Sequence, residues 1–237
     1  ILNTSTHCSV LSENPMHQWL SEAVENNSIV ITPNRRLARA LKSTYDKEQL
    51  AHGHKAWLSP NIRFLNDWLI SNINNTADFS PIVIGSYASS IIWERYFKEQ
   101  VGDTILNIGT LVLQAKESWQ RLHDWQVPLS EVSSKARNKD EKLFAAAARK
   151  YQTHLLSNNW IDDAQIIGTV IDLMKSGVIP VPDRIVYVGF NRMNPVIEDL
   201  FEVMGQFKCV VTSAQTNKTP NDASVAIFDD VNAELRA

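Results

Sequence analysis

The residues best suited to chemistry surround a turn that follows a short apolar run. Residues 28–31 (SIVI) lead into this turn, and the positions around it offer hydrogen-bond donors: Thr32, Asn34, Arg35 and Arg36. Hydroxyl, amide and guanidinium groups without a catalytic carboxylate are suited to binding an anion. The alternative is that the two arginines are solvated side chains of an ordinary first helical turn.

A second set of candidate residues lies at the next strand-to-helix step, within residues 56–70. Asn61 and Arg63 fall near the start of this step. They could join the arginine pair if the two strands are neighbours, as sequential strands usually are. Arg39, one turn beyond Arg35, is a further candidate on the same helix. For Asn61 taken alone, ordinary loop polarity is the competing interpretation.

The pattern around these residues predicts the elements that position them. The β-favouring residues 28–32, a proline and a possible N-cap at Asn34 indicate strand, turn and helix, with the helix running to about Leu50. In this helix Leu37 and Leu41 recur at helical spacing and are expected in the core. Open α/β sheets bind ligands at the carboxyl ends of their strands, which is where this turn lies.

The rest of the chain predicts an α/β sheet interrupted by helices. Strand signals disappear between residues 86 and 176, where four amphipathic helices are expected, and return at 184–190 and 207–213. The 28–32 and 184–190 strands are expected to share a parallel sheet. The expected boundaries are 1–75 and 181–216 for the two parts of the α/β domain, 76–180 for an inserted all-helical subdomain, and 217–237 for a linker and the start of a following domain.

Aromatic residues of the helical segment have two interpretations. They could be platforms on which nucleic-acid bases stack, or they could be core residues, and their helical spacing favours the core. The residues concerned are Trp93, Trp119, Trp125, Tyr151 and Trp160.

The sequence contains no active site of a common enzyme class, so no catalytic residue is assigned. No pair of its eight glycines fits the pattern G-x-x-x-x-G-K-[ST], which makes nucleotide hydrolysis through a P-loop improbable in this segment. Pro182-Asp183 is not followed by the carboxylate and lysine of a PD-(D/E)-x-K nuclease. The adjacent carboxylates Asp162 and Asp163 are expected to cap a helix.

Composition restricts the partners and the location of the chain. Cys8 and Cys209 are far apart, and His52 and His54 have no carboxylate cluster beside them, so no disulfide, metal site or cofactor is predicted. The net charge of −3 confines any nucleic-acid contact to a local patch. No apolar run approaches the roughly 18 residues of a membrane span, and the cysteine usage fits a reducing compartment, so we expect a cytoplasmic protein.

The order of these parts resembles that of a known family. Residues 29–41 (IVITPNRRLARAL) resemble motif Ia of superfamily 1 helicases of the UvrD/Rep kind, and residues 61–69 (NIRFLNDWL) resemble their motif Ib. The helical segment lies where this family inserts its 1B subdomain, and residues 185–191 (IVYVGFN) lie where it has its Walker B strand. Gly189 and Phe190, followed by Asn191, replace the Walker B Asp-Glu pair.

These replacements resemble a particular group within the family. The inactivated helicase half of AddB-type helicase–nuclease subunits lacks the same motifs. So do bacterial probable DNA repair proteins, which pair such a half with a C-terminal PD-(D/E)-x-K nuclease. The first residue of this chain is not methionine, and its last residues look like the start of a helix, so we expect a piece of a longer polypeptide whose nuclease would lie further on.

The resemblance implies a fold and a function. The fold is a P-loop-NTPase-like parallel sheet, similar to helicase domain 1A, with a 1B-like insertion. The function is binding of single-stranded DNA without ATP turnover, with the backbone contacted by Thr32, Asn34, Arg35, Arg36, Arg39, Asn61 and Arg63.

Two other hypotheses remain open. In the first, the chain is a scaffold that docks a partner helicase subunit without contacting DNA, and a broad apolar patch on the helices would favour it. In the second, the chain is an enzyme whose active site is completed by a region outside it. A basic cleft between the two strand-to-helix steps would favour DNA binding instead.

Overall fold

Four parallel strands form the sheet on which the molecule is built. The computed structural model describes residues 15–76, 81–101 and 107–214. In the described chain the strand order is β2-β1-β5-β6, and every neighbouring pair is parallel. The strands are β1 (Ile29–Thr32), β2 (Ile62–Phe64), β5 (Arg184–Val188) and β6 (Val210–Ala214).

The pairing of these strands confirms two predictions. Val30 pairs with Ile62 of β2 on one side and with Val186 of β5 on the other, so β1 is an inner strand. The sequential strands β1 and β2 are therefore neighbours, and the 28–32 and 184–190 segments share a parallel sheet. An α/β fold is thus present, with a small parallel sheet covered by helices.

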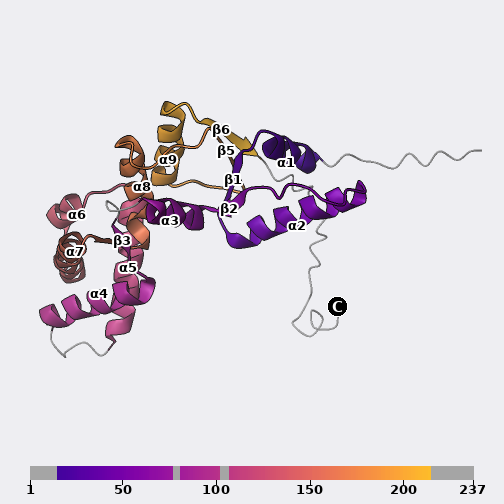
Figure 1. Ribbon diagram of the computed structural model, residues 1–237. Coiled ribbons are helices and arrows are strands. Elements are labelled where there is room, and N and C mark those ends of the chain that lie inside the picture. The colour runs from indigo at the N-terminus through magenta and orange to yellow at the C-terminus, as the bar shows by residue number, and fades with distance from the viewer. Residues whose placement is uncertain (1–14, 77–80, 102–106, 215–237) are drawn as a thin grey trace, which may run out of the picture.

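Helices cover both faces of the sheet (Figure 1). Ile31 and Ile185 point into a core shared with α3 (Leu65–Asn75), α8 (Ile166–Lys175) and α9 (Pro195–Gln206). Val30 and Val188 point to the other face, against α1 (Pro15–Glu25) and α2 (Arg35–Ala51). Because both faces are buried, β1 and β5 are apolar at nearly every position, as is usual for strands of parallel sheets.

The remaining helices form a unit with a core of its own. This helical module comprises α4 (Ser86–Val101), α5 (Ile108–Asp124), α6 (Leu129–Lys135) and α7 (Lys139–Ser157). Trp93, Trp119 and Tyr151 lie at its centre, and each is at most 1% exposed. The core interpretation is confirmed for these three aromatics, so they are not available as stacking platforms. Trp125 is exposed. In Figure 1 the module lies at one end of the molecule and α2 at the other.

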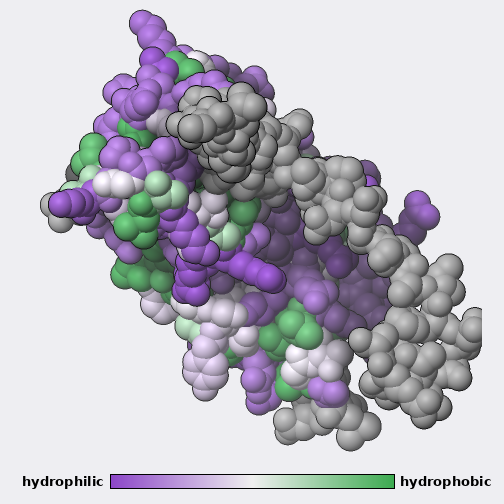
Figure 2. Space-filling view, turned by 90° about the vertical axis from the view of Figure 1, so that its right-hand side faces the viewer, coloured by the Kyte–Doolittle hydropathy of each residue, from purple (hydrophilic) through white to green (hydrophobic). Residues whose placement is uncertain are grey.

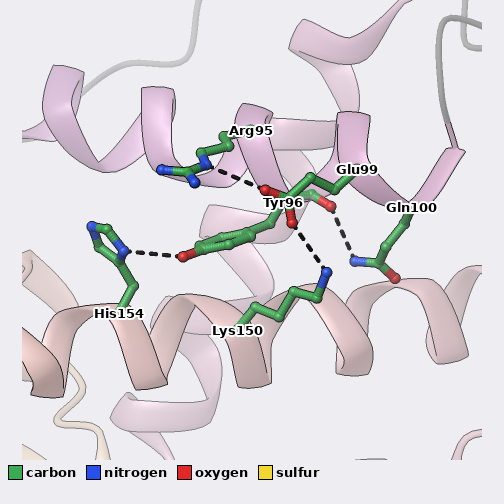
Figure 3. Close-up of polar contacts among 6 residues, drawn as sticks. All are labelled: Arg95, Tyr96, Glu99, Gln100, Lys150 and His154. Atoms are coloured by element: carbon green, nitrogen blue, oxygen red, sulfur yellow. Dashed lines mark hydrogen bonds and ion pairs between the residues drawn. The ribbon is translucent and has the colours of Figure 1, made fainter.

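A polar seam joins α4 to α7 on the surface of this module (Figure 3). Glu99 lies between Arg95 and Lys150, at 3.2 and 3.1 Å, and these cations hold the pKa of Glu99 below its usual value, Lys150 contributing most. The Tyr96 hydroxyl lies 3.0 Å from Nδ1 of His154. Each cation is thus paired or packed within the seam, which favours a role in holding the two helices together.

The structure differs from the predicted all-helical insertion in two ways. The short strands β3 (Ile82–Val83) and β4 (Trp160–Ile161) form a parallel pair within residues 76–180. Two residues are too few to produce an alternating pattern, so these strands could not be recognised from the sequence. In addition, α8 packs in the core of the sheet with α3 and α9, and not in the core of the helical module. The predicted linker and following domain at 217–237 lie outside the described residues.

The surface shown in Figure 2 is largely hydrophilic, with hydrophobic residues in small separate groups. Within the described ranges, no helix is both long and apolar enough to cross a membrane.

Candidate nucleic-acid interface

Four cationic side chains line an open groove between α2 and the outer strand β2. The groove has a volume of about 420 Å³. We call it the basic groove, and its cations are Arg35, Arg39, Lys42 and Arg63. Asp67, in the first turn of α3, is the one carboxylate among its lining residues. The lining therefore carries a formal charge of +3, in a chain whose total is −3.

Helix α2 presents three of these cations on one face. Arg35, Arg39 and Lys42 are spaced four and three residues apart, which places them on neighbouring turns of the same side. The neighbouring side of α2 is packed against the sheet by Ala38, Leu41 and Tyr45. Asn34 starts the helix, because its side-chain oxygen accepts a hydrogen bond from the Leu37 backbone N–H at 2.8 Å. The basic face is thus held by a capped and packed helix.

Strand β2 supplies the fourth cation from the opposite wall of the groove. Arg63 is exposed in the middle of this three-residue strand, while its neighbour Ile62 is buried. The Arg63 Nε donates a hydrogen bond to Oδ1 of Asn61 at 3.0 Å. Asn61 therefore positions Arg63, and its backbone oxygen also accepts from the Val30 N–H of β1 at 2.9 Å. The two strand-to-helix steps therefore meet where β2 pairs with β1.

Asp67 and Phe64 hold the side chain of Arg35. The guanidinium donates to both carboxylate oxygens of Asp67, from Nε at 2.8 Å and from Nη2 at 2.5 Å. It also lies over the Phe64 ring, 5.4 Å from the centroid. The hydrogen bond from Arg35 holds the pKa of Asp67 below its usual value, so the carboxyl is ionised at neutral pH. Arg35 is therefore the one groove cation with a bidentate carboxylate partner among the described residues.

Three predicted contact residues are placed differently from the expectation. Thr32 is fully buried, and its single hydroxyl hydrogen is shared between the backbone oxygens of Asn34 at 3.0 Å and Arg63 at 3.3 Å, so it cannot reach a ligand. Asn34 is exposed, but its side-chain oxygen is used to cap α2. Arg36 is exposed and lies outside the lining of the groove. Polar groups in a turn between a buried strand and a helix are needed to satisfy the backbone hydrogen bonds of the fold. This explains why the side chains of Thr32 and Asn34 are not free to bind a ligand.

Two of the three residues at the predicted Walker B position, Gly189 and Phe190, pack against apolar side chains. Phe190 packs against the rings of Tyr187 and Phe201, with centroids 6.1 Å away in each case. Gly189 has a φ of +81°, and a Cβ at this position would collide with the Leu37 side chain of α2. Asn191 is exposed. This end of β5 is therefore in close contact with the first turn of the helix that forms the basic groove.

Replacing Gly189 by alanine is expected to destabilise the protein. A residue with a Cβ costs about 1–2 kcal/mol in the left-handed region, and Leu37 must also move. Urea unfolding followed by circular dichroism measures the loss. Gly168→Ala is the matched control, because Gly168 lies in helix α8 with no atom within 4 Å of its Cβ position, and this change should stabilise slightly. Equal changes in the free energy of unfolding for the two substitutions would contradict the proposed steric role of Gly189.

Sequence reasoning missed three residues of the basic groove. Lys42 could have been found, because it shares the spacing of Arg35 and Arg39 along α2. Asp67 and Phe64 had no signal of their own, because their role depends on how the start of α3 meets α2 in space. Elsewhere, Asp162 caps the turn before α8, as predicted.

Comparison with protein-family models and with curated proteins finds no significant match for this chain. In the residues that the structure describes, no group of three or more His, Cys, Asp or Glu side chains could hold a metal ion.

Proposed function

We propose that this chain is a non-hydrolysing helicase-like domain that binds the backbone of single-stranded DNA, as part of a bacterial DNA repair or recombination protein of the helicase–nuclease type. The basic groove carries this proposal. It gathers four cations from two successive strand-to-helix steps, in a chain with no excess of positive charge overall. Phosphate contacts of this kind do not depend on base sequence.

The electrostatics of the groove support a polyanionic ligand. In the described part of the chain, Arg39, Lys42 and Arg63 have no carboxylate within ion-pair distance. Three such cations on one open surface repel one another, and a strand of phosphates relieves that repulsion while releasing its own bound counterions. A single small anion would use only part of this lining, whereas a backbone with regularly spaced charges matches cations on both walls.

The fold supports the absence of ATP turnover in this proposal. The parallel sheet and the step from β1 to α2 agree with a P-loop-NTPase-like origin, yet the sequence has no P-loop pattern. The end of β5, where a metal-binding carboxylate pair would stand in that family, holds Gly189 and Phe190 packed against apolar side chains. A domain of this kind would bind DNA but could not use ATP hydrolysis to move along it.

Removing three groove cations together should weaken DNA binding. For Arg39→Ala, Lys42→Ala, Arg63→Ala in one chain, we expect at least about tenfold lower affinity, from roughly 0.5–1 kcal/mol for each exposed charge contact. The slope of log affinity against log salt should become shallower by about 2, at about 0.7 for each single-strand phosphate contact. Fluorescence anisotropy of a labelled 20-residue oligothymidylate measures both quantities.

A matched control separates groove contacts from total charge. Lys139, Lys142 and Arg149 are three exposed cations of α7, at the other end of the molecule from α2 (Figure 1). Their simultaneous replacement by alanine changes the net charge equally and should leave the affinity and the salt slope nearly unchanged. Equal losses in the two triple variants, or no measurable binding by the wild-type chain, would refute the proposal.

Exposed apolar residues on the helical module favour the alternative function, docking of a partner helicase subunit. Tyr87 and Ile91 lie one turn apart on α4 and are 81% and 50% exposed. Leu113 is exposed on α5, which packs against α4. Serine at these three positions should abolish a docking interaction without changing the affinity for oligothymidylate, so one pair of titrations distinguishes the two functions.

A further inference from the structure

One carboxylate in the basic groove, that of Asp67, would compete with a phosphate ligand for Arg35. Arg35 is the cation nearest the start of α2, and both of its hydrogen bonds go to Asp67. A guanidinium presents the same fork of donors to a carboxylate and to a phosphate, so it cannot grip both in this bidentate way at once. In the free protein the fork of Arg35 is occupied.

We propose that Asp67 regulates the groove as an internal counter-ion, which holds Arg35 in the free protein and must be displaced before Arg35 contacts a phosphate. This inference rests on the function proposed above and deepens it. It divides the groove into two kinds of cation. Arg39, Lys42 and Arg63 meet the backbone directly, whereas Arg35 contributes only after an exchange of partners.

The exposure of the pair makes this exchange feasible. The side chains of Arg35 and Asp67 are 65% and 45% exposed. An ion pair in such surroundings is worth only about 0–1 kcal/mol, so a phosphate ester can compete with the carboxylate. The exchange costs most of what Arg35 gains, and the net contribution of Arg35 to binding is therefore small while Asp67 is present.

The surroundings of the pair keep the counter-ion in place. Phe64 lies under the guanidinium and limits where it can turn. Asp67 stands in the first turn of α3, where the helix dipole favours a negative side chain. The fixed carboxylate also adds a negative charge to the groove lining and repels a backbone that approaches without exchanging partners. Asp67 thus limits affinity in two ways, through Arg35 and through its own charge.

The Asp67→Asn substitution separates these two effects when it is combined with Arg35→Ala. Asparagine is nearly isosteric and can remain in the first turn of α3. If the counter-ion acts through Arg35, Asp67→Asn should tighten binding of oligothymidylate about two- to fivefold, which corresponds to the release of one exposed ion pair. The salt slope should steepen by about 0.7, the value of one additional phosphate contact.

The same substitution in the Arg35→Ala background gives the decisive comparison. There the gain in affinity should fall below half of its wild-type size, and the salt slope should not steepen, because no arginine is released. Asp67→Glu, which keeps the charge, should bind like the wild type. Thermal unfolding of all variants checks that the fold is retained.

Two results would overturn the inference while leaving DNA binding in place. One is binding by the wild-type chain that Asp67→Asn does not tighten. The other is a gain in the Arg35→Ala background of half its wild-type size or more, which would show that Asp67 acts mainly through its own charge. Failure of the proposed function is distinguished from both, because in that case the wild-type chain would not bind the oligonucleotide.

Discussion

Replacing Trp93 by alanine is expected to destabilise the helical module by about 3–5 kcal/mol, the usual cost of removing a fully buried large aromatic side chain. Trp93 has no exposed surface. Its ring stacks on Tyr151 with 4.3 Å between centroids and lies about 6 Å from three other aromatic rings, those of Phe97, Trp119 and Phe144. No neighbour can fill so large a cavity without leaving its own position, so little of the loss should be recovered. Urea unfolding followed by circular dichroism measures the change.

Trp125→Ala is the control for this prediction. Trp125 ends helix α5 with 65% of its surface exposed, and its removal should change stability by no more than about 0.5 kcal/mol. The two tryptophans also distinguish core from stacking roles. A Trp93→Ala protein that kept its stability but lost affinity for oligothymidylate would show that this residue is a stacking platform, contrary to its burial.

The Trp93→Ala substitution should not disturb the basic groove, because the two lie in different cores of the protein. Trp93 belongs to the core of the helical module, whereas α2 and β1 pack in a different core, around Leu41 and Val30. Damage to the module should therefore leave the basic groove largely intact. At temperatures where the sheet remains folded, Trp93→Ala should bind the oligonucleotide with nearly wild-type affinity.

Much of the fold could be predicted from local patterns. The strand β1, the capping residue Asn34 and the core position Leu41 all follow from signals within a few residues of the chain. The position of β5 beside β1 followed from its apolar composition and from the resemblance to a helicase. A run of β-favouring apolar residues is typical of a strand that is buried on both faces, as the inner strands of a parallel sheet are. For this reason the expected positions of β1 and β5 are confirmed.

The groove was harder to predict because its geometry depends on contacts between elements distant in sequence. Thr32 has the donor group that a phosphate site needs, but it also ends a buried strand, and its hydroxyl is consumed by backbone oxygens. Asp67 lies 32 residues from Arg35, and the two come together because β2 pairs with β1, which places the start of α3 close to the start of α2. The sequence thus predicted a basic surface, while the pairing within it required the structure.

A buried hydrogen-bonded chain in the helical module shows the same dependence. The Tyr151 hydroxyl donates to Oδ2 of Asp162 at 2.7 Å and lies 2.8 Å from the Ser89 hydroxyl, and all three residues are buried. The other oxygen of Asp162 accepts from the Ala164 N–H. Since α4, α7 and the segment before α8 meet here, this chain connects the module to the sheet. Nothing in the sequence linked these positions.

Tyr151→Phe is expected to cost about 3 kcal/mol near neutral pH, because it leaves a buried carboxylate without one of its donors. Burial already raises the pKa of Asp162 above its usual value, although the Tyr151 hydrogen bond opposes this shift. Without that hydrogen bond the pKa of Asp162 should rise further. Part of the lost stability should return on acidification, because the protonated carboxyl no longer needs the donor.

The pH dependence of the wild-type protein tests the same carboxyl, since a native pKa above the unfolded value means that the native state binds more protons between the two values. In that window the free energy of unfolding falls as the pH rises, and above the native pKa the contribution of Asp162 is constant. In Asp162→Asn the amide can still accept from Ala164 and donate to Tyr151, but it does not titrate. The stability of Asp162→Asn relative to the wild type should therefore increase from about pH 4 upward and then level off, as measured by urea unfolding at a series of pH values. Parallel profiles for the two proteins would mean that Asp162 has the same pKa in the folded and unfolded chains, which would contradict the expected net effect of its burial.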